Sequence, residues 1–349
     1  MPISTQEALK MNLSMWRKAL TVIPEVTKEE WDRLDIVSRW LISTRAAVLL
    51  MTFLSAVLAG VFAIRDGYHI SLWAWLVLIL GLVLAHAANN LFNDYTDYAR
   101  GVDRDNYYRT QYGPQPIASG LMTRRQHLTY FIVTGLLALA CGLVLLAWRN
   151  WDPFIWLLLG LGAFFVLFYT WPLKYLALGE LAVFVVWGPL MIGGGYYVLT
   201  GQWSWLVVLA SLPYTLGVTT VLLGKHIDKL AMDQEKRIHT LPVVIGEKAA
   251  RYLMLGMMIL SYVLVIGMVV AGIFTPVMLA VVLALPTFRK LYPMMLKPKP
   301  ETCPPDFPQG QGGWPLYFAP IAFVNNRAFG TWFLLGLLVD TALKAFVLR

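Results

Sequence analysis

A run of polar side chains at the end of one long apolar stretch could bind a divalent metal ion. They stand four, three and four residues apart and so share one face of a helix: His86, Asn90, Asn93 and Asp97. Asp94 lies beside them. Amide and carboxylate oxygens are the hard ligands that Mg²⁺ prefers. Because ionisable groups are costly in lipid, this face must turn toward a bundle interior or an aqueous cavity.

Asp103 stands six residues beyond Asp97 and would point elsewhere on a straight helix. Gly101 between them permits a bend, so we expect Asp103 to fold back to the same ion. The alternative is a solvated acidic helix end, although segments that flank membrane helices are normally basic.

A second acidic cluster follows a later apolar stretch, in LLGKHIDKLAMDQEKRIHTL (222–241). Its acids are Asp228 and Asp233, and basic residues follow them. Two such clusters, each ending an apolar helix, suit a substrate with a diphosphate head and a long apolar tail. Mg²⁺ would bridge carboxylate and diphosphate oxygens. Basic side chains would neutralise the remaining charge, and the candidates are Arg100, Arg109, Lys225, Lys236 and Arg237.

The elements that must position these residues are transmembrane helices. Of the 349 residues, 58% are hydrophobic and 14% are charged, whereas globular proteins average about 45–50% and about 25%. The sequence therefore predicts an all-α polytopic membrane protein, with nine transmembrane helices in one bundle and two Asp-rich cytoplasmic loops. The nine apolar stretches are 42–64, 71–92, 126–147, 152–171, 178–199, 203–224, 250–274, 276–292 and 328–347.

The distribution of positive charge predicts the orientation of this bundle. With nine spans and the N-terminus inside, only four of the 28 Lys and Arg residues fall on the opposite side: Arg65, Arg149, Lys344 and Arg349. We therefore expect an integral, multi-pass protein, in the inner membrane if the source is bacterial, with its N-terminus and both Asp-rich loops in the cytoplasm. The basic loops account for the net charge of +8, so nucleic acid is not an expected partner.

We expect two parts in the chain. Residues 1–41 would form a cytoplasmic N-terminal segment, in which Glu25–Ile42 has apolar residues near helical spacing and should lie along the membrane surface. Residues 42–349 would form the nine-helix domain. The N-terminal sequence has no signal-peptide pattern, and two cysteines, Cys141 and Cys303, are too few for a disulfide framework.

Two segments resemble the UbiA superfamily of intramembrane prenyltransferases, which are nine-helix bundles with two Asp-rich motifs on cytoplasmic loops. NDYTDYARGVD (Asn93 to Asp103) is similar to the first motif, with Asp at the first, fourth and tenth positions after Asn and Gly at the eighth. LALGELAVFVVWGPLMIGGGYYVLTG (Leu176 to Gly201) is similar to the fifth span. Both look like the menaquinone-type, dihydroxynaphthoate branch, and the resemblance covers nearly the whole chain from about residue 40.

The resemblance implies Mg²⁺-dependent transfer of a polyprenyl group from an allylic diphosphate to an aromatic acceptor, a quinone precursor such as dihydroxynaphthoate, with release of diphosphate. The implied metal ligands are Asn93, Asp94, Asp97, Asp103, Asp228 and Asp233. The implied catalytic residues are Asp97, Asp233, Arg100, Lys236 and Glu180, and the implied substrate-binding residues are Arg109, Lys225, Arg237 and Asn90. For Glu180, a structural position favoured by the dipole of a helix N-terminus remains an equal alternative.

The second motif departs from the superfamily pattern. Members carry two Asp residues four apart. Asp233 matches the later one, but Lys229 stands where the earlier one belongs, and Asp228 is displaced by one residue. Five residues turn an ideal helix by about 140°, so a looser turn is needed to bring Asp228 and Asp233 together. Lys225 and His226 stand in place of the family's Asn pair.

Other functions remain open, namely a prenyltransferase for another lipid acceptor, a catalytically silent relative and an ion-coupled transporter. Transporters place intramembrane polar groups near the bilayer midplane on broken helices, whereas the acids here lie at helix ends on one side. A phosphatidyltransferase that uses a CDP-alcohol would need Asp-Gly followed by Ala-Arg at a fixed spacing, which Asp94 to Arg100 does not provide. The sequence names no protein partner.

Overall fold

The structure is a computed structural model that describes residues 11–102, 114–305 and 314–346. Within these ranges the chain is helical and contains no β-strand. The elements are α1 (Leu13–Thr21), α2 (Lys28–Asp32), α3 (Ile36–Ser43), α4 (Ala46–Arg65), α5 (Leu72–Ala99), α7 (Arg124–Trp148), α8 (Pro153–Phe168), η2 (Leu173–Tyr175), α9 (Gly179–Val185), η3 (Val186–Gly193), α10 (Gly194–Thr200), α11 (Trp205–Asp228), α12 (Leu230–Glu235), α13 (Leu241–Ile245), α14 (Glu247–Val270), η4 (Pro276–Ala284), α15 (Leu285–Leu296) and α16 (Phe318–Phe346).

Eight helical segments of the described chain are long and apolar enough to cross a bilayer. They correspond to eight of the nine predicted spans. The remaining predicted span, 152–171, forms α8, which has 16 residues. At 1.5 Å per residue α8 extends about 24 Å, which is less than the roughly 30 Å of a bilayer core. The chain is therefore an integral, multi-pass membrane protein with at least these eight apolar segments.

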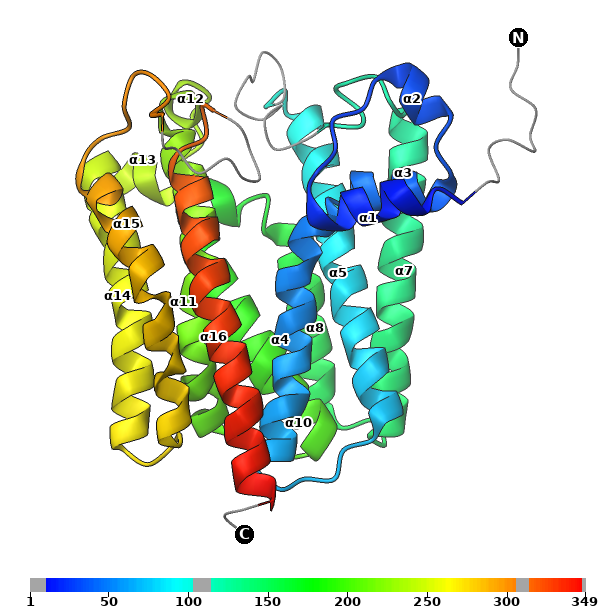
Figure 1. Cartoon of the computed structure of the whole chain (residues 1–349). Coiled ribbons are helices and arrows are strands. Elements are labelled where there is room, and N and C mark those ends of the chain that lie inside the picture. Colours follow the sequence, from blue (N-terminus) through cyan, green and yellow to red (C-terminus); the bar gives the residue numbers. More distant parts are fainter. Residues whose placement is uncertain (1–10, 103–113, 306–313, 347–349) are drawn as a thin grey trace.

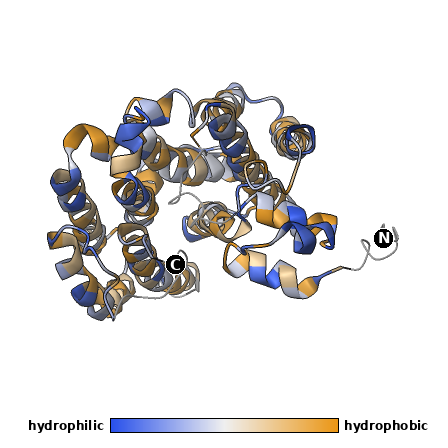
Figure 2. Ribbon diagram, turned by 90° about the horizontal axis from the view of Figure 1, so that it is seen from above, coloured by the Kyte–Doolittle hydropathy of each residue, from blue (hydrophilic) through white to orange (hydrophobic). Residues whose placement is uncertain are grey.

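The helices form one bundle in which α11 is the most enclosed member (Figure 1). It contacts α9, η3, α14 and α16, while α4 packs against α5, α10 and α16 and α5 packs along α7. Figure 2 views the bundle down its length and shows apolar residues along the sides of the helices. The helices α1, α2 and α12 lie at one end, and the last turn of α16 lies at the other (Figure 1).

One membrane crossing, residues 179–200, is built from three helices in sequence. Its middle element, η3, is a π-helical turn that contains Pro189. Proline has no backbone N–H to donate, and wider turns of this kind often occur at functional sites. Gly188 lets α11 approach closely, because a Cβ there would lie 2.8 Å from Thr215 Oγ1. The crossing 276–296 is likewise composite, with η4 followed by α15.

The last helix, α16, begins at Phe318, ten residues before the predicted span. The early half contains Asn325 and Asn326, which the prediction assigned to a loop but which the bundle buries. Asn326 packs against α11 at Gly217, where a Cβ would lie 2.2 Å from Asn326 Oδ1. Tertiary packing therefore extends the helix through a polar stretch.

The far half of α16 is tied to α4 by a buried ion pair. Arg65 Nε lies 2.5 Å from Asp340 Oδ2, and both side chains are almost fully buried. The other oxygen of Asp340 accepts the backbone N–H of Thr275 at 2.7 Å. One carboxylate thus joins α4, α16 and the residue before η4.

The N-terminal segment folds as three short helices, rather than as one helix over 25–42. The break falls at Asp35, which caps α3 by accepting the N–H groups of Val37 and Ser38. The same carboxylate accepts the indole N–H of Trp16 from α1 at 3.1 Å. Burial opposes ionisation of Asp35, but hydrogen bonds from Ser38, Trp16 and Asn12 outweigh it and lower its pKa from 3.8 to about 2.

Candidate functional site

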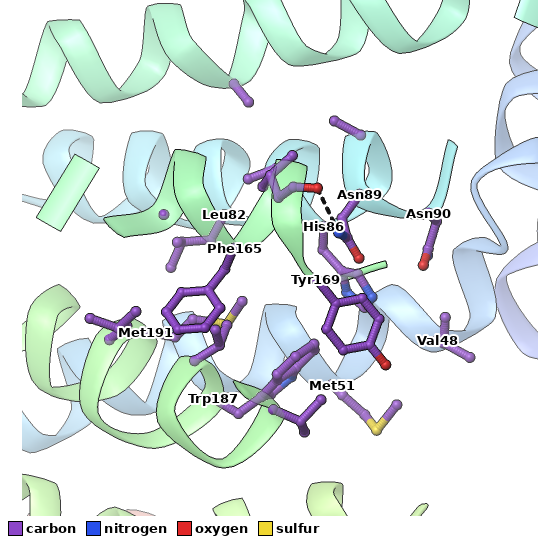
Figure 3. Close-up of a pocket in the computed structure, with 18 of the residues that line it drawn as sticks. Val48, Met51, Leu82, His86, Asn89, Asn90, Phe165, Tyr169, Trp187 and Met191 are labelled. Carbon is purple, nitrogen blue, oxygen red and sulfur yellow. Dashed lines mark hydrogen bonds between the residues drawn. The ribbon is translucent and has the colours of Figure 1, made fainter. Parts of the chain in front are cut away.

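A cavity of about 740 Å³ lies among α4, α5, α7, α8, η3 and α11. Its wall is mostly apolar, and Figure 3 shows Phe165, Tyr169 and Trp187 together on one part of it. Met51 and Met191 contribute flexible thioether side chains. This volume falls in the range of about 300–1,000 Å³ that small-molecule sites occupy. The cavity can therefore enclose an apolar group of drug-like size.

One end of the cavity is polar. Arg45, Asn90, Asn93 and Lys225 all line it, although Asn90 also donates to the carbonyl oxygen of Thr44 at 2.8 Å. The predicted stripe on α5 thus faces the bundle interior, as the cost of polar groups in lipid requires. An apolar chamber with a polar mouth suits an amphiphilic ligand.

Deeper on the same stripe, His86 lies beside an aromatic wall. Its Nδ1 is 2.7 Å from the hydroxyl of Thr52. The imidazole meets Trp187 edge to face, with 5.2 Å between ring centroids (Figure 3). The contact links the stripe of α5 to the π-helical turn η3.

Both described carboxylates of the first acidic motif are buried and paired with basic residues. Asp94 pairs with Arg45. Asp97, which is fully buried, pairs with Lys174, whose Nζ is 3.1 Å from each carboxylate oxygen. Asp103, the third predicted carboxylate of this motif, lies outside the described residues. The positive charge that makes burial of these acids tolerable is therefore supplied from within the chain.

Arg45 occupies an unusual backbone position. It stands between α3 and α4 with φ +53°, in the left-handed region that non-glycine residues seldom adopt. Such a conformation costs of order 1–3 kcal/mol and persists where surrounding contacts fix it, often at functional sites. The guanidinium contacts Asp94 and lies 3.3 Å from Gln115 Oε1. The bend between the two helices thus aims Arg45 at the first acidic motif.

The two acids of the second motif have different surroundings. Asp233 is 3.2 Å from Lys229 Nζ and accepts the Thr240 hydroxyl at 3.4 Å. Asp228 accepts three backbone N–H groups at the start of α16, from residues 317, 318 and 319, at 2.9–3.0 Å. These N–H groups belong to the first turn of a helix and have no partner within it. Asp228 therefore anchors the N-terminus of α16.

The second motif contacts the end of the first motif at Lys236, the residue that follows α12. Lys236 Nζ donates to the carbonyl oxygen of Val102 at 2.6 Å. A smaller pocket of about 450 Å³ lies at this junction, lined by Arg100, Gly101, Val102, Tyr175 and Lys236. The predicted residues Arg100 and Lys236 are thus brought together. The structure places Arg237 on the exposed surface, and the predicted Arg109 lies outside the described residues.

Glu180 forms a buried pair that the sequence did not predict. His226 Nδ1 lies 2.7 Å from Glu180 Oε1, and both side chains are at most 4% exposed. The second oxygen, Oε2, is buried with no hydrogen-bond partner in the described structure. On the same helices, Ala182 and Val183 of α9 and Leu222 of α11 line the cavity. The buried pair therefore belongs to two helices that form part of the cavity wall.

The donor set fits Mg²⁺ bound jointly by protein and substrate. Among the residues that the structure describes, no three acidic, histidine or cysteine side chains converge to hold a metal by themselves. The acids of both motifs offer carboxylate oxygens, and Asn93 adds an amide oxygen at the cavity mouth. Mg²⁺ is usually bound through one or two carboxylates together with substrate phosphates and water, which such a set can provide.

Lys174 was not among the predicted site residues. It is the single charged residue of the short segment between α8 and α9, and a basic residue at a helix end needs no special cause. Lys174 is only 5% exposed and contacts Asp97, so it belongs to the candidate site. The one feature of the sequence that could have identified Lys174 is that it is the single charged residue between two apolar helices.

Comparison with known proteins identifies the family. A profile described as the UbiA prenyltransferase family matches residues 53–305. The 1,4-dihydroxy-2-naphthoate octaprenyltransferase of Bacillus subtilis is 26% identical over 248 residues, which cover 70% of this chain and 77% of that protein. The Escherichia coli protein of the same name is 29% identical over 219 residues, covering 61% and 70%.

Solved structures show the same fold. A UbiA homolog from Aeropyrum pernix K1 superposes with a TM-score of 0.60 at 19% identity, over 84% of this chain and 96% of that one. A UbiA homolog from Archaeoglobus fulgidus, bound to DMAPP and Mg²⁺, gives a TM-score of 0.53 at 14% identity, over 84% and 98%. At these identities the likeness concerns the fold.

Proposed function

The chain belongs to the UbiA prenyltransferase family, and we propose that it transfers a polyprenyl group from an allylic diphosphate to an aromatic acceptor within the membrane. It is accordingly a prenyltransferase. The observation that carries the proposal is the cavity, which is apolar along most of its length and polar at the mouth beside the first acidic motif. An allylic diphosphate has the same division into an apolar chain and a charged head.

We assign the acceptor to the dihydroxynaphthoate class of quinone precursors. The naphthoate prenyltransferases of Bacillus subtilis and Escherichia coli support this choice, as does the segment GELAVFVVWGPL (179–190), which contributes Trp187 to the cavity. Aromatic side chains on the cavity wall provide faces on which a flat ring can stack.

Mg²⁺ would be held by the first acidic motif, through Asn93, Asp94, Asp97 and Asp103, and Asp233 of the second motif would act on the diphosphate together with Lys229. The UbiA homolog solved with DMAPP and Mg²⁺ supports this choice of metal. When bound, the ion neutralises charge on the diphosphate and so favours its departure. We assign Asp228 to the anchoring of α16 rather than to the metal, because its oxygens accept three backbone N–H groups.

In the proposed reaction the bond between the allylic carbon and the diphosphate oxygen breaks, and its electron pair leaves with the diphosphate. Arg45 and Lys174, already held against the motif carboxylates, stabilise that negative charge, and Arg100, Lys236 and Lys225 complete the basic surface. The allylic cation remains against Tyr169 and Trp187, whose ring faces attract positive charge. The apolar wall keeps water away from the cation.

The acceptor ring then forms a bond from one of its carbons to the allylic cation, and the group that this carbon carried leaves without its bonding electrons, as H⁺ from a C–H bond or as CO₂ from a carboxylate, so that the ring regains its aromaticity. Loss of a proton from an acceptor hydroxyl group makes that ring more electron-rich. We propose that Glu180 takes up this proton at Oε2, because that oxygen is buried without a partner while Oε1 is held by His226.

We further propose nine membrane crossings, with α8 as the fourth and with the N-terminus and both acidic motifs in the cytoplasm. The described chain starts at one end of the bundle and finishes at the other (Figure 1), as an odd number of crossings requires. The helices α1 to α3 would lie in the membrane interface, where α1 presents Leu13 and Leu20 beside Arg17 and Lys18.

The test is a transfer assay on the purified chain in detergent, with radiolabelled geranylgeranyl diphosphate, Mg²⁺ and a panel of acceptors: dihydroxynaphthoate, hydroxybenzoate and homogentisate. We expect a lipid-soluble labelled product with dihydroxynaphthoate, abolished by a chelator. Product with another acceptor would move the chain to that acceptor class. Binding of the diphosphate without product from any acceptor would contradict the proposed transfer.

A further inference from the structure

The second acidic motif carries a buried positive charge of its own. Lys229 Nζ lies 3.2 Å from Asp233 Oδ1, and the two side chains are 3% and 2% exposed. Taking a carboxylate out of water costs several kcal/mol unless a counter-charge and hydrogen bonds compensate. Lys229, together with the hydroxyl of Thr240, provides that compensation for Asp233.

The other acids of this motif are not arranged in this way. Asp228 is held by the backbone of α16, and Glu235 is exposed. Within 222–241, all of which the structure describes, Asp233 is thus the acid that combines burial with a lysine partner. The second motif therefore offers one carboxylate and one ammonium group. A pair of carboxylates would attract a divalent ion more strongly than this ion pair does.

Lys229 stands in the chain between two lysines that line the pockets of the proposed substrate site. Lys225, one helical turn earlier in the chain, lines the mouth of the large cavity. Lys236, later in the same segment, contacts Val102 at the end of the first motif. Lys229 is therefore flanked in the sequence, four residues before and seven residues after, by the lysines through which the second motif meets the proposed substrate site.

We propose that Lys229 binds the diphosphate and takes the place of a divalent ion at the second motif, its ammonium group bridging Asp233 to a diphosphate oxygen. This inference rests on the proposed function. An ammonium group has three N–H donors and can hold a carboxylate and a phosphate oxygen together. The chain then binds a prenyl diphosphate with one divalent ion fewer than a variant whose second motif carries two carboxylates.

The experiment measures the number of metal ions bound per chain and does not depend on enzymatic activity. Full-length protein in lipid nanodiscs is titrated with Mn²⁺ in the presence of geranylgeranyl thiolodiphosphate, an unreactive analogue, and bound Mn²⁺ is counted by electron paramagnetic resonance. We expect Lys229→Asp to bind one more Mn²⁺ per chain than the wild type. Lys248→Asp, at an exposed position of α14, makes the same change in net charge and should leave the count unchanged.

A second variant covers the case in which Lys229→Asp fails to fold. Lys229→Met removes the ammonium group without adding a ligand, so the Mn²⁺ count should stay the same. The affinity for the analogue should fall by about tenfold or more, as expected for the loss of a hydrogen bond to a charged group. Thermal unfolding of both variants shows whether each is folded.

Two results would overturn the proposal: equal Mn²⁺ counts in the wild type and folded Lys229→Asp, or unchanged analogue affinity in Lys229→Met. Failure of the proposed function gives a different pattern, in which the wild type itself shows no Mn²⁺-dependent binding of the analogue or, in the transfer assay, binds the diphosphate without forming product from any acceptor.

Discussion

At the scale of single residues, the main feature of the site is that its acids are already paired. Asp94 pairs with Arg45, Asp97 with Lys174 and Asp233 with Lys229. A divalent ion that approaches these carboxylates alone must displace or repel a buried cation. A diphosphate that arrives with the ion gives each displaced cation a new negative partner. Metal and substrate binding should therefore reinforce each other.

We predict that Mg²⁺ alone binds weakly and that geranylgeranyl thiolodiphosphate raises its affinity by about 5- to 150-fold, the usual range for coupled sites. Replacing Lys174 with Met should strengthen binding of Mg²⁺ alone, because Asp97 loses its competing partner. Isothermal titration calorimetry of both proteins, with and without the analogue, measures the coupling. Equal Mg²⁺ affinity in the presence and absence of the analogue would contradict this account.

The Glu180–His226 pair leads to a separate prediction about proton transfer. Glu180→Gln keeps the shape of the side chain but removes its basic oxygen, so kcat should fall by about 10²- to 10⁴-fold. Binding of the thiolodiphosphate should remain near the wild-type value, since Glu180 contacts the acceptor rather than the diphosphate in our proposal. Glu247→Gln, at the outer end of α14, is the matched control. A loss of diphosphate binding in Glu180→Gln would instead assign the residue to the charged head.

At the scale of helices, apolar length alone predicted where most membrane segments run. It did not predict their ends. The helix α5 continues through the acids to Ala99, and α16 starts at Phe318, because buried partners make polar residues acceptable inside a bundle. The pairs Arg45–Asp94 and Lys174–Asp97 join residues 49 and 77 positions apart. Such contacts depend on the fold and leave no local pattern in the sequence.

The candidate site, like the helices, was predicted from the sequence only in part. The polar face of α5 was found from its helical spacing, and the resemblance to the UbiA superfamily was confirmed by the family match. The expected pairing of Asp228 with Asp233 required a looser turn, and the structure instead shows Asp228 on the first turn of α16. A one-residue displacement along a helix end was therefore enough to give the side chain another neighbour.

Asp228→Ala tests the anchoring role at this scale. Three backbone N–H groups would lose their acceptor, so the free energy of unfolding should fall by at least about 2 kcal/mol. The melting temperature should fall correspondingly, while Mn²⁺ binding with the thiolodiphosphate stays intact at low temperature. Asp233→Asn should show the reverse, with weaker binding of the thiolodiphosphate, because Lys229 loses the carboxylate that holds it, and a smaller change in melting temperature. Loss of metal binding in a folded Asp228→Ala would return Asp228 to the ligand set.

At the scale of the whole molecule, the proposed topology is tested by a cysteine that the chain already contains. Cys303 is exposed in the connection between α15 and α16, whereas Cys141 lies within α7. With nine crossings, an impermeant maleimide should label Cys303 from the cytoplasmic side of inverted vesicles and leave intact spheroplasts unlabelled. A Cys303→Ser variant gives the background. Labelling of intact spheroplasts would reverse the proposed orientation.

The two anchors of α16 also bear on how the protein is made. Asp228 at one end of the bundle and Arg65 at the other both take partners from this helix. Until α16 has been synthesised and packs against the bundle, Asp228 lacks the backbone N–H groups whose hydrogen bonds it accepts, and Arg65 lacks Asp340. Both ends of the bundle are therefore fixed only after α4 and α11 have been inserted.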